Sequence, residues 1–238
     1  MKLKKILTVI VGMGVVLLFV LLAGSLMNEE SSQDEVTGDT VLVPQNSVDI
    51  AELNHLATTN FAEFMNINAG KAEWTAFTIK GRQIPATTGL KALDVRIPAE
   101  MESALDISNW GIYSCAGNSA TPKFVLRLNF ALTETGELMT YNQKLQALRR
   151  WESTMLDDTK NILYPSEFYE LTNISNNEFS DVSNPHLINL RQTSVHSNNL
   201  AVGDLSYVVV ADMLFVGSDT VCLIEKALDV IGFDGTKS

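Results

Sequence analysis

The stretch LSYVVVADMLFVGSDTVCLIEKALDVI, residues 205–231, decides the fold that we predict. Two apolar runs, Tyr207 to Val210 and Leu214 to Val216, flank Ala211-Asp212, and short apolar runs around such a pair are typical of a tight hairpin. After the second run the apolar residues recur every three or four positions, which predicts a helix capped by Ser218 or Asp219. We therefore expect a hairpin followed by a helix that folds back onto the sheet.

A nucleotide-binding strand–helix turn is the alternative for the same stretch. Such a turn needs several glycines so that the backbone can approach a phosphate, whereas this one has only Gly217. Asp212 and Asp219 would also repel a phosphate. The chain has no GxSxG or HExxH motif, and its three histidines lie on separate predicted elements. We therefore predict no catalytic, cofactor-binding or metal site.

The N-terminus predicts a membrane anchor over residues 6–27. Residues 6–24 carry no charge, and nineteen helical residues span roughly 30 Å, the thickness of the hydrocarbon core. Residues of this predicted anchor include Ile6, Val11, Leu17, Phe19 and Leu22. The lysines of residues 1–5, which are Lys2, Lys4 and Lys5, favour a cytoplasmic N-terminus and an extracytoplasmic remainder. A cleaved signal peptide ending near Ala23-Gly24-Ser25 is the alternative.

The rest of the chain is acidic. All 28 acids but only 14 of the 17 lysines and arginines follow residue 27, so this part has a net charge near −14. Such a surface excludes nucleic acid as a general electrostatic partner. Residues 28–48 contain five acids and no base, which predicts a flexible tether. We expect one folded domain over 49–233 and a short tail at 234–238.

Hydrophobic periodicity predicts an α+β domain with a mostly antiparallel sheet. In chain order we expect a helix from Asp49 to about residue 68, a strand at 73–81, two helical turns around Pro98, strands at 109–115 and 122–132, a helix at about 134–158, a loop at 159–185 and a strand at 187–195. Residues 109–157 and 205–231 both give strand, strand, helix, so two ββα-like units are expected. Helices should cover one face of the sheet.

The predicted helix at 134–158 presents an apolar stripe. Its members are Leu138, Tyr141, Leu145, Leu148, Trp151 and Met155. The opposite side is charged and contains Lys144, Arg149, Arg150 and Glu152. We expect the stripe to pack within the domain, although a partner-binding helix would have the same pattern. The residues that we predict in the structural core are Leu145, Leu148, Trp151, Tyr207 and Leu228.

The chain has two cysteines, Cys115 and Cys222. An even count in an oxidising compartment favours a disulfide. On a helical wheel, however, Cys222 falls with the charged residues of the last helix, away from Leu223 and Ile224. A disulfide would then form only if that helix lies at an edge of the sheet. We expect two free thiols, with the disulfide as the alternative.

Three separated motifs share a pattern with known sequences. They are Trp151-Glu152 in the predicted long helix, Phe179 with Asp181, and Arg191 in a predicted strand. In these motifs, and over about residues 74–231, the chain resembles an uncharacterised family of single-pass, membrane-anchored proteins of small-genome bacteria. The resemblance implies a place in the bacterial envelope and no known activity. We expect Trp151 to anchor the core and Glu152 to form a salt bridge or a cap.

The expected function is therefore a non-enzymatic, membrane-anchored protein of the cell envelope that binds or scaffolds another protein, or a second copy of itself. The bilayer is its other partner, through residues 6–27. The alternative is an envelope enzyme or a small-ligand-binding domain whose site forms only in the fold. A pocket lined by convergent polar groups would favour the alternative. A flat apolar patch, or a free sheet edge at 187–196, would favour a protein partner.

Overall fold

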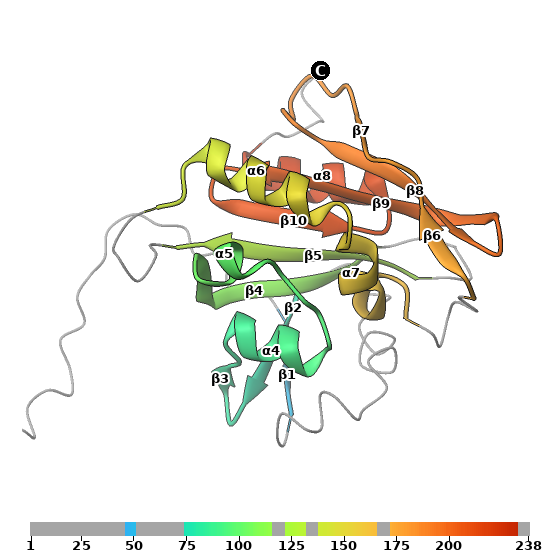
Figure 1. Ribbon diagram of the computed structural model, residues 1–238. Helices are drawn as coiled ribbons and strands as arrows, with labels where there is room; N and C mark the ends of the chain where they lie inside the picture. Colours follow the sequence, from blue (N-terminus) through green and yellow to red (C-terminus); the bar gives the residue numbers. More distant parts are fainter. Residues whose placement is uncertain (1–45, 51–73, 116–121, 132–137, 166–171, 233–238) are drawn as a thin grey trace, which may run out of the picture. The chain divides into compact units, whose positions relative to one another are not determined.

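The computed structural model describes residues 46–50, 74–115, 122–131, 138–165 and 172–232 (Figure 1). Among these residues no helix has the length and apolar character needed to cross a membrane. The predicted anchor, most of the predicted tether and the tail lie outside the described residues. The same holds for the predicted first helix beyond Ile50. Asp49, its expected first cap, belongs to a strand.

The strands among the described residues form one sheet. Its strands are β1 (Asn46–Asp49), β2 (Trp74–Ile79), β3 (Arg82–Gln83), β4 (Leu105–Cys115), β5 (Lys123–Phe130), β6 (Ile174–Asn176), β7 (Ser180–Asp181), β8 (Arg191–Ser197), β9 (Leu200–Val210) and β10 (Met213–Gly217). The order is β1-β2-β4-β5-β10-β9-β8-β6, with β3 paired to β2 and β7 paired to β8. Among these described strands, only the β1–β2 pair is parallel. The predicted α+β class with a mostly antiparallel sheet is therefore confirmed.

The two predicted hairpins are present and meet at the centre of the sheet. β4 pairs with β5, β9 pairs with β10, and β5 pairs with β10, all antiparallel. Val210 and Met213 face each other across the two-residue turn Ala211-Asp212, where Ala211 has a φ of 51°. Each hairpin is followed by a helix, so the order strand, strand, helix occurs twice.

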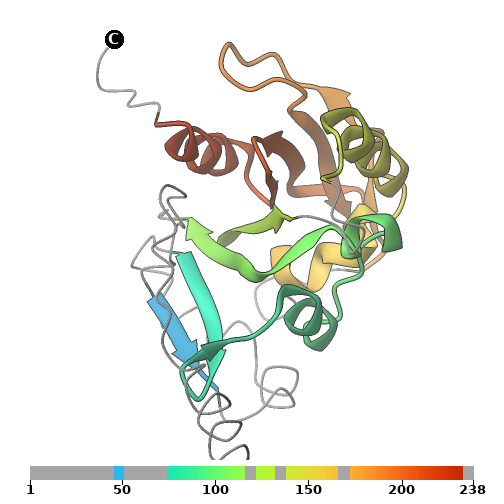
Figure 2. The same cartoon turned by 90° about the vertical axis from the view of Figure 1, so that its left-hand side faces the viewer.

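The helices cover both faces of the sheet, not one as predicted. They are α4 (Ala86–Ala92), α5 (Ala99–Glu102), α6 (Tyr141–Trp151), α7 (Met155–Leu163) and α8 (Thr220–Val230). α4 to α7 pack on one face, in a core that includes Leu126 and Leu214, whereas α8 packs on the other, in a core that includes Val125 and Phe215 (Figure 2). The central strands are apolar on both sides, so each face needs a cover.

The predicted helix at 134–158 is two helices in the described residues. α6 ends at Trp151 and α7 begins at Met155, because side chains between them take hydrogen bonds that a continuous helix would not use. Ser153 donates to the Arg150 carbonyl, and Thr154 donates to Asp158. Two further expectations about the exposed and buried sides of this segment are wrong: Leu138 and Tyr141 are exposed.

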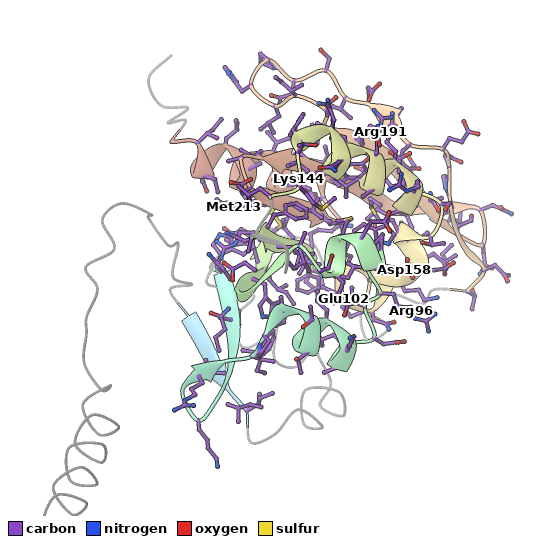
Figure 3. All side chains as sticks on the ribbon, turned by 60° about the vertical axis from the view of Figure 1, so that its left-hand side comes forward. Arg96, Glu102, Lys144, Asp158, Arg191 and Met213 are labelled. Atoms are coloured by element: carbon purple, nitrogen blue, oxygen red, sulfur yellow. A yellow bond between two sulfur atoms is a disulfide. The ribbon has the colours of Figure 1, made fainter. Side chains whose placement is uncertain are left out.

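Lys144, predicted on the solvated side of α6, is buried. Its exposed fraction is 3 %, and it lies between α6 and the sheet (Figure 3). Its Nζ is 2.6 Å from Asp212 Oδ1 in the β9–β10 turn and 4.7 Å from the centre of the Phe130 ring. The ion pair and the ring offset the cost of burying the ammonium group, and they hold α6 against the second hairpin.

The predicted loop at 159–185 is also corrected. α7 continues to Leu163, and the later part of the segment supplies the short strands β6 and β7. The strand predicted at 187–195 begins only at Arg191 and runs to Ser197. Both of its neighbours are strands, β9 on one side and β6 with β7 on the other. The edge at 191–197 is therefore not free.

The expectation of free thiols is wrong, because Cys115 and Cys222 form a disulfide with a Cα–Cα distance of 6.1 Å. α8 does not need to lie at an edge for this contact. Ser218, just before α8, exchanges hydrogen bonds with the Phe124 backbone, which brings the helix start beside the end of β4. Lys226 follows Cys222 by four residues and is on the same side of α8. Its Nζ lies 4.7 Å from the Tyr113 ring centre. The side of α8 that was predicted to face solvent therefore packs against β4.

Candidate functional site

Arg191 is the centre of an ion-pair network between α6 and the sheet. Its Nε and Nη2 donate to the two carboxylate oxygens of Glu152, at 2.9 and 3.0 Å. Its Nη1 donates to Asp181 Oδ1 at 3.1 Å, and Tyr207 Oη donates to Glu152 Oε1 at 2.6 Å. The two-pronged contact with Glu152 fixes both the distance and the orientation of α6 relative to β8.

The end of α6 explains why Glu152 faces the sheet. Trp151, 2 % exposed, is in the core, where its Nε1 donates to Asp158 Oδ2 at 2.8 Å. Thr154 Oγ1 donates to the same oxygen at 2.7 Å, which closes the turn between α6 and α7. Glu152 is the C-cap of α6, so the chain leaves the helix where this carboxylate meets Arg191. The expected roles of Trp151 and Glu152 are both confirmed.

The network holds its protons tightly. The hydrogen bond to Glu152 raises the pKa of Arg191 further above its ordinary range, against the opposing effect of burial. Burial, followed by the hydrogen bond to Glu152, raises the pKa of Tyr207 above its ordinary value of 10. Glu152 thus accepts bonds from two donors that do not release protons near neutral pH, and these groups serve as structural supports.

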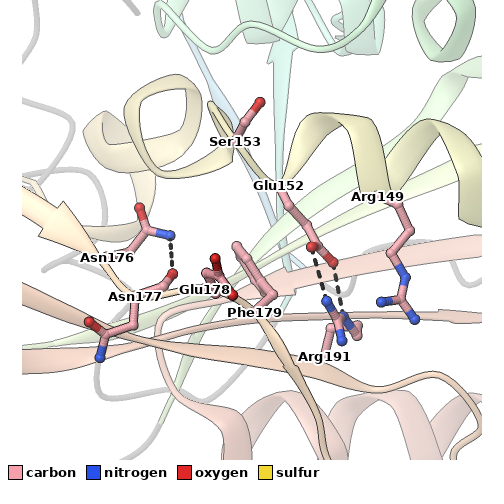
Figure 4. A pocket seen from close by; sticks show the side chains of 8 residues that line it. All are labelled: Arg149, Glu152, Ser153, Asn176, Asn177, Glu178, Phe179 and Arg191. Atoms are coloured by element: carbon pink, nitrogen blue, oxygen red, sulfur yellow. Dashed lines mark hydrogen bonds and ion pairs between the residues drawn. The ribbon is translucent and has the colours of Figure 1, made fainter.

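Beside this network lies a cleft with a volume of about 460 Å³. Its lining residues come from the end of α6 and from the β6–β7 segment, with Arg191 beneath them: Arg149, Glu152, Ser153, Asn176, Asn177, Glu178, Phe179 and Arg191 (Figure 4). Most of these side chains are polar, and Ser153, Asn177 and Glu178 are exposed at the surface. The volume lies within the range of small-molecule sites.

A bulge in the edge strand shapes the cleft. β6 ends with Asn176 opposite Val195, and β7 begins with Ser180 opposite Gln192. Three residues, 177–179, therefore face two residues of β8. The Asn177 carbonyl accepts from Thr193 Oγ1 at 2.7 Å, which fixes the bulge. Bulges bend an edge strand and redirect its side chains, and they are common beside functional sites.

Phe179 occupies the middle of the cleft, between the two asparagines and the Glu152–Arg191 pair (Figure 4). Its ring is half-buried and packs on Tyr207, with the ring centres 5.6 Å apart. Because Tyr207 also bonds to Glu152, one rigid support carries both the aromatic and the charged part of the cleft.

The structure brings together motifs that are far apart in the sequence. Glu152, Phe179 and Arg191 all line the cleft, and Asp181 binds Arg191 beside it. Of the predicted core residues, Leu148, Trp151 and Tyr207 are buried, whereas Leu145 and Leu228 are only partly buried.

The sequence did not predict that amide and hydroxyl side chains line a cleft. Their one sequence signal is the run of Asn and Ser residues in 172–185, which has no hydrophobic period. Among the described residues, no group of three or more His, Cys, Asp or Glu side chains is placed to hold a metal ion. Comparisons with family models, curated proteins and solved structures find no match for this chain.

Proposed function

We propose that the protein is a membrane-anchored, extracytoplasmic binding domain that holds a polar ligand in the cleft between α6 and β6–β7. The observation that carries the proposal is the cleft itself: polar residues from α6 and from the β6–β7 segment line it beside Phe179, on a support fixed by Arg191. The charged groups beneath it are paired with one another, so they suit binding better than proton transfer. The domain therefore binds and does not catalyse.

The location is proposed from two independent features. The uncharged run at 6–24 behind Lys2, Lys4 and Lys5 supports an anchor with the domain outside the cytoplasm. The Cys115–Cys222 disulfide supports the same side, because disulfides persist in oxidising compartments and are rare in the cytosol. Both cysteines of the chain are used in this bond.

The strand order places the cleft far along the sheet from the point where the chain enters the domain. The anchor precedes β1, which is at one end of the order, and β6 is at the other. Seven steps of about 4.8 Å separate them, or roughly 34 Å along the sheet.

A protein partner is the second candidate, and the cleft is its best surface too. The β8 edge is not available for strand addition, because β6 and β7 already pair with it. Arg149 and Ser153 on α6 and Asn177 and Glu178 on the bulge are exposed polar groups that a protein loop can contact.

Site-specific photo-crosslinking in native membranes tests the binding function. A photoreactive residue replaces Asn177 in the cleft, and a matched control replaces Glu225, which is exposed on α8 on the other face of the sheet. We expect an adduct from position 177 and none from position 225. A protein adduct would favour the second candidate, and the absence of any adduct from the cleft would refute the binding function.

The location has its own test, which does not depend on the cleft. Protease added outside spheroplasts should digest the domain and spare a short N-terminal fragment. Full protection of the domain would overturn the proposed topology.

A further inference from the structure

The charges around the cleft limit what it can hold, given the proposed binding function. Among the residues that the structure describes, the charged side chains in or beside it are Arg149, Arg191, Glu152, Glu178 and Asp181. Both arginines already bind carboxylates: Arg191 binds Glu152 and Asp181, and Arg149 Nη2 lies 3.3 Å from Asp181 Oδ1. An anionic ligand would have to displace these carboxylates and would meet a net negative site.

A cationic ligand is also poorly served. Glu178 is exposed, and an ion pair at an exposed carboxylate contributes little to binding because solvent screens it. The more sheltered carboxylate, Glu152, already accepts three hydrogen bonds from Arg191 and Tyr207. The cleft therefore suits an uncharged ligand.

The backbone beside the cleft disfavours an extended peptide. A peptide strand binds best to an uninterrupted row of backbone donors and acceptors. Here the edge consists of a three-residue and a two-residue strand, and the bulge at 177–179 interrupts them. A bulge of this kind is one way in which proteins prevent strand addition at a sheet edge.

The remaining lining groups match a sugar ring. A pyranose has C–H groups on its faces and hydroxyl groups around its rim, so it packs against an aromatic ring while its rim forms hydrogen bonds. Phe179 supplies the ring, held in place by Tyr207. Asn176, Asn177 and Ser153 supply amides and a hydroxyl, groups that both donate and accept, as a sugar hydroxyl does (Figure 4). Asn176 Nδ2 donates to the Asn177 carbonyl at 2.9 Å, which orients its amide.

We infer that the ligand of the cleft is an uncharged saccharide chain, one ring of which packs on Phe179 while Asn176, Asn177 and Ser153 bond to its hydroxyls. The inference rests on the proposed binding function and adds the chemical class of the ligand. The open surface position of Asn177 and Glu178 lets the chain continue beyond the cleft.

The test uses the full-length protein in lipid nanodiscs on an array of neutral oligosaccharides, acidic oligosaccharides and peptides. We expect retention of neutral oligosaccharides, and calorimetry with the strongest neutral hit should give an affinity that changes little between about 50 and about 500 mM salt, because no net charge is neutralised. Asn177→Ala, which leaves the bulge backbone intact, and Phe179→Leu, which removes the ring, should each weaken that affinity by about tenfold. Glu225→Ala is the matched control and should bind as the parent does.

Three results would overturn the saccharide inference: retention of acidic oligosaccharides only, retention of peptides only, or a neutral hit whose affinity neither cleft variant changes. If position 177 forms adducts in native membranes and no neutral oligosaccharide binds, the ligand class is wrong and the binding function stands. If neither adducts nor array binding is found, both are wrong.

Discussion

The Cys115–Cys222 disulfide should contribute strongly to the stability of the domain. Replacing both cysteines by alanine opens a loop of 107 residues in the unfolded chain. In the chain-entropy model, closing a loop of this length contributes about 4.8 kcal/mol at 25 °C. For a domain of this size each kcal/mol shifts Tm by about 2–4 °C, so the double variant should melt about 10–20 °C below the parent.

Circular dichroism melts of the full-length protein in detergent measure this difference. Reductant should lower the Tm of the parent by a similar amount and leave the double variant unchanged, which separates the disulfide from any packing effect of the substitutions. Thiol labelling of the denatured, unreduced parent should find no free cysteine, and labelling after reduction should find two. A reductant shift below about 3 °C would refute the loop-entropy reasoning. Two reactive thiols before reduction would refute the bond itself.

Three substitutions test the local geometry. Gly89→Ala places a Cβ 2.3 Å from Cζ2 of Trp110. The free energy of unfolding, measured by urea titration, should therefore fall by about 1–3 kcal/mol or more. Ala211→Gly relieves a φ of 51° in the β9–β10 turn and should raise the free energy of unfolding by up to about 1 kcal/mol; a lower value would refute the strain. Tyr207→Phe removes the donor to Glu152 and should cost about 1.5–3 kcal/mol at neutral pH. Folding raises the pKa of Tyr207, so the stability that its hydroxyl contributes is complete below pH 10 and is lost as the pH rises above that value. The Tyr207→Phe variant should therefore lose less of its free energy of unfolding at alkaline pH than the parent does.

The parts of the fold that depend on local pattern could be predicted. The hairpin around Ala211-Asp212 and the cap of the last helix follow from neighbouring residues, and Asp219 indeed accepts from the Cys222 backbone N–H at 2.9 Å. The break after Trp151 could not be predicted in this way, because no Gly or Pro marks it. Asp158 closes the turn by accepting from Trp151 and Thr154, and the first of these bonds depends on where the Trp151 ring packs in the core. A helical wheel likewise cannot tell which strand lies beneath Cys222.

The candidate site was predictable only as separate motifs. Glu152 and Arg191 meet because α6 packs on the face of the sheet to which Arg191 points, and that face depends on the register of β8 with β9. A shift of one residue would turn Arg191 to the other face. Asn177 lines the cleft because of a bulge that has no strong sequence signal. The polar run at 172–185 therefore predicted a loop but not the position of that loop in the fold.

The junction between β5 and β10 has a consequence for how the chain is made. In the finished sheet β5 is a central strand, but its partner β10 is synthesised on the order of 90 residues later. Until then β5 is an apolar strand with an unpaired edge, beside a Cys115 that has no Cys222 to bond. The nascent chain thus passes through a long interval in which the free edge of its first hairpin can pair with another copy. Completion of the last hairpin ends that interval, and the disulfide then makes the closure hard to reverse.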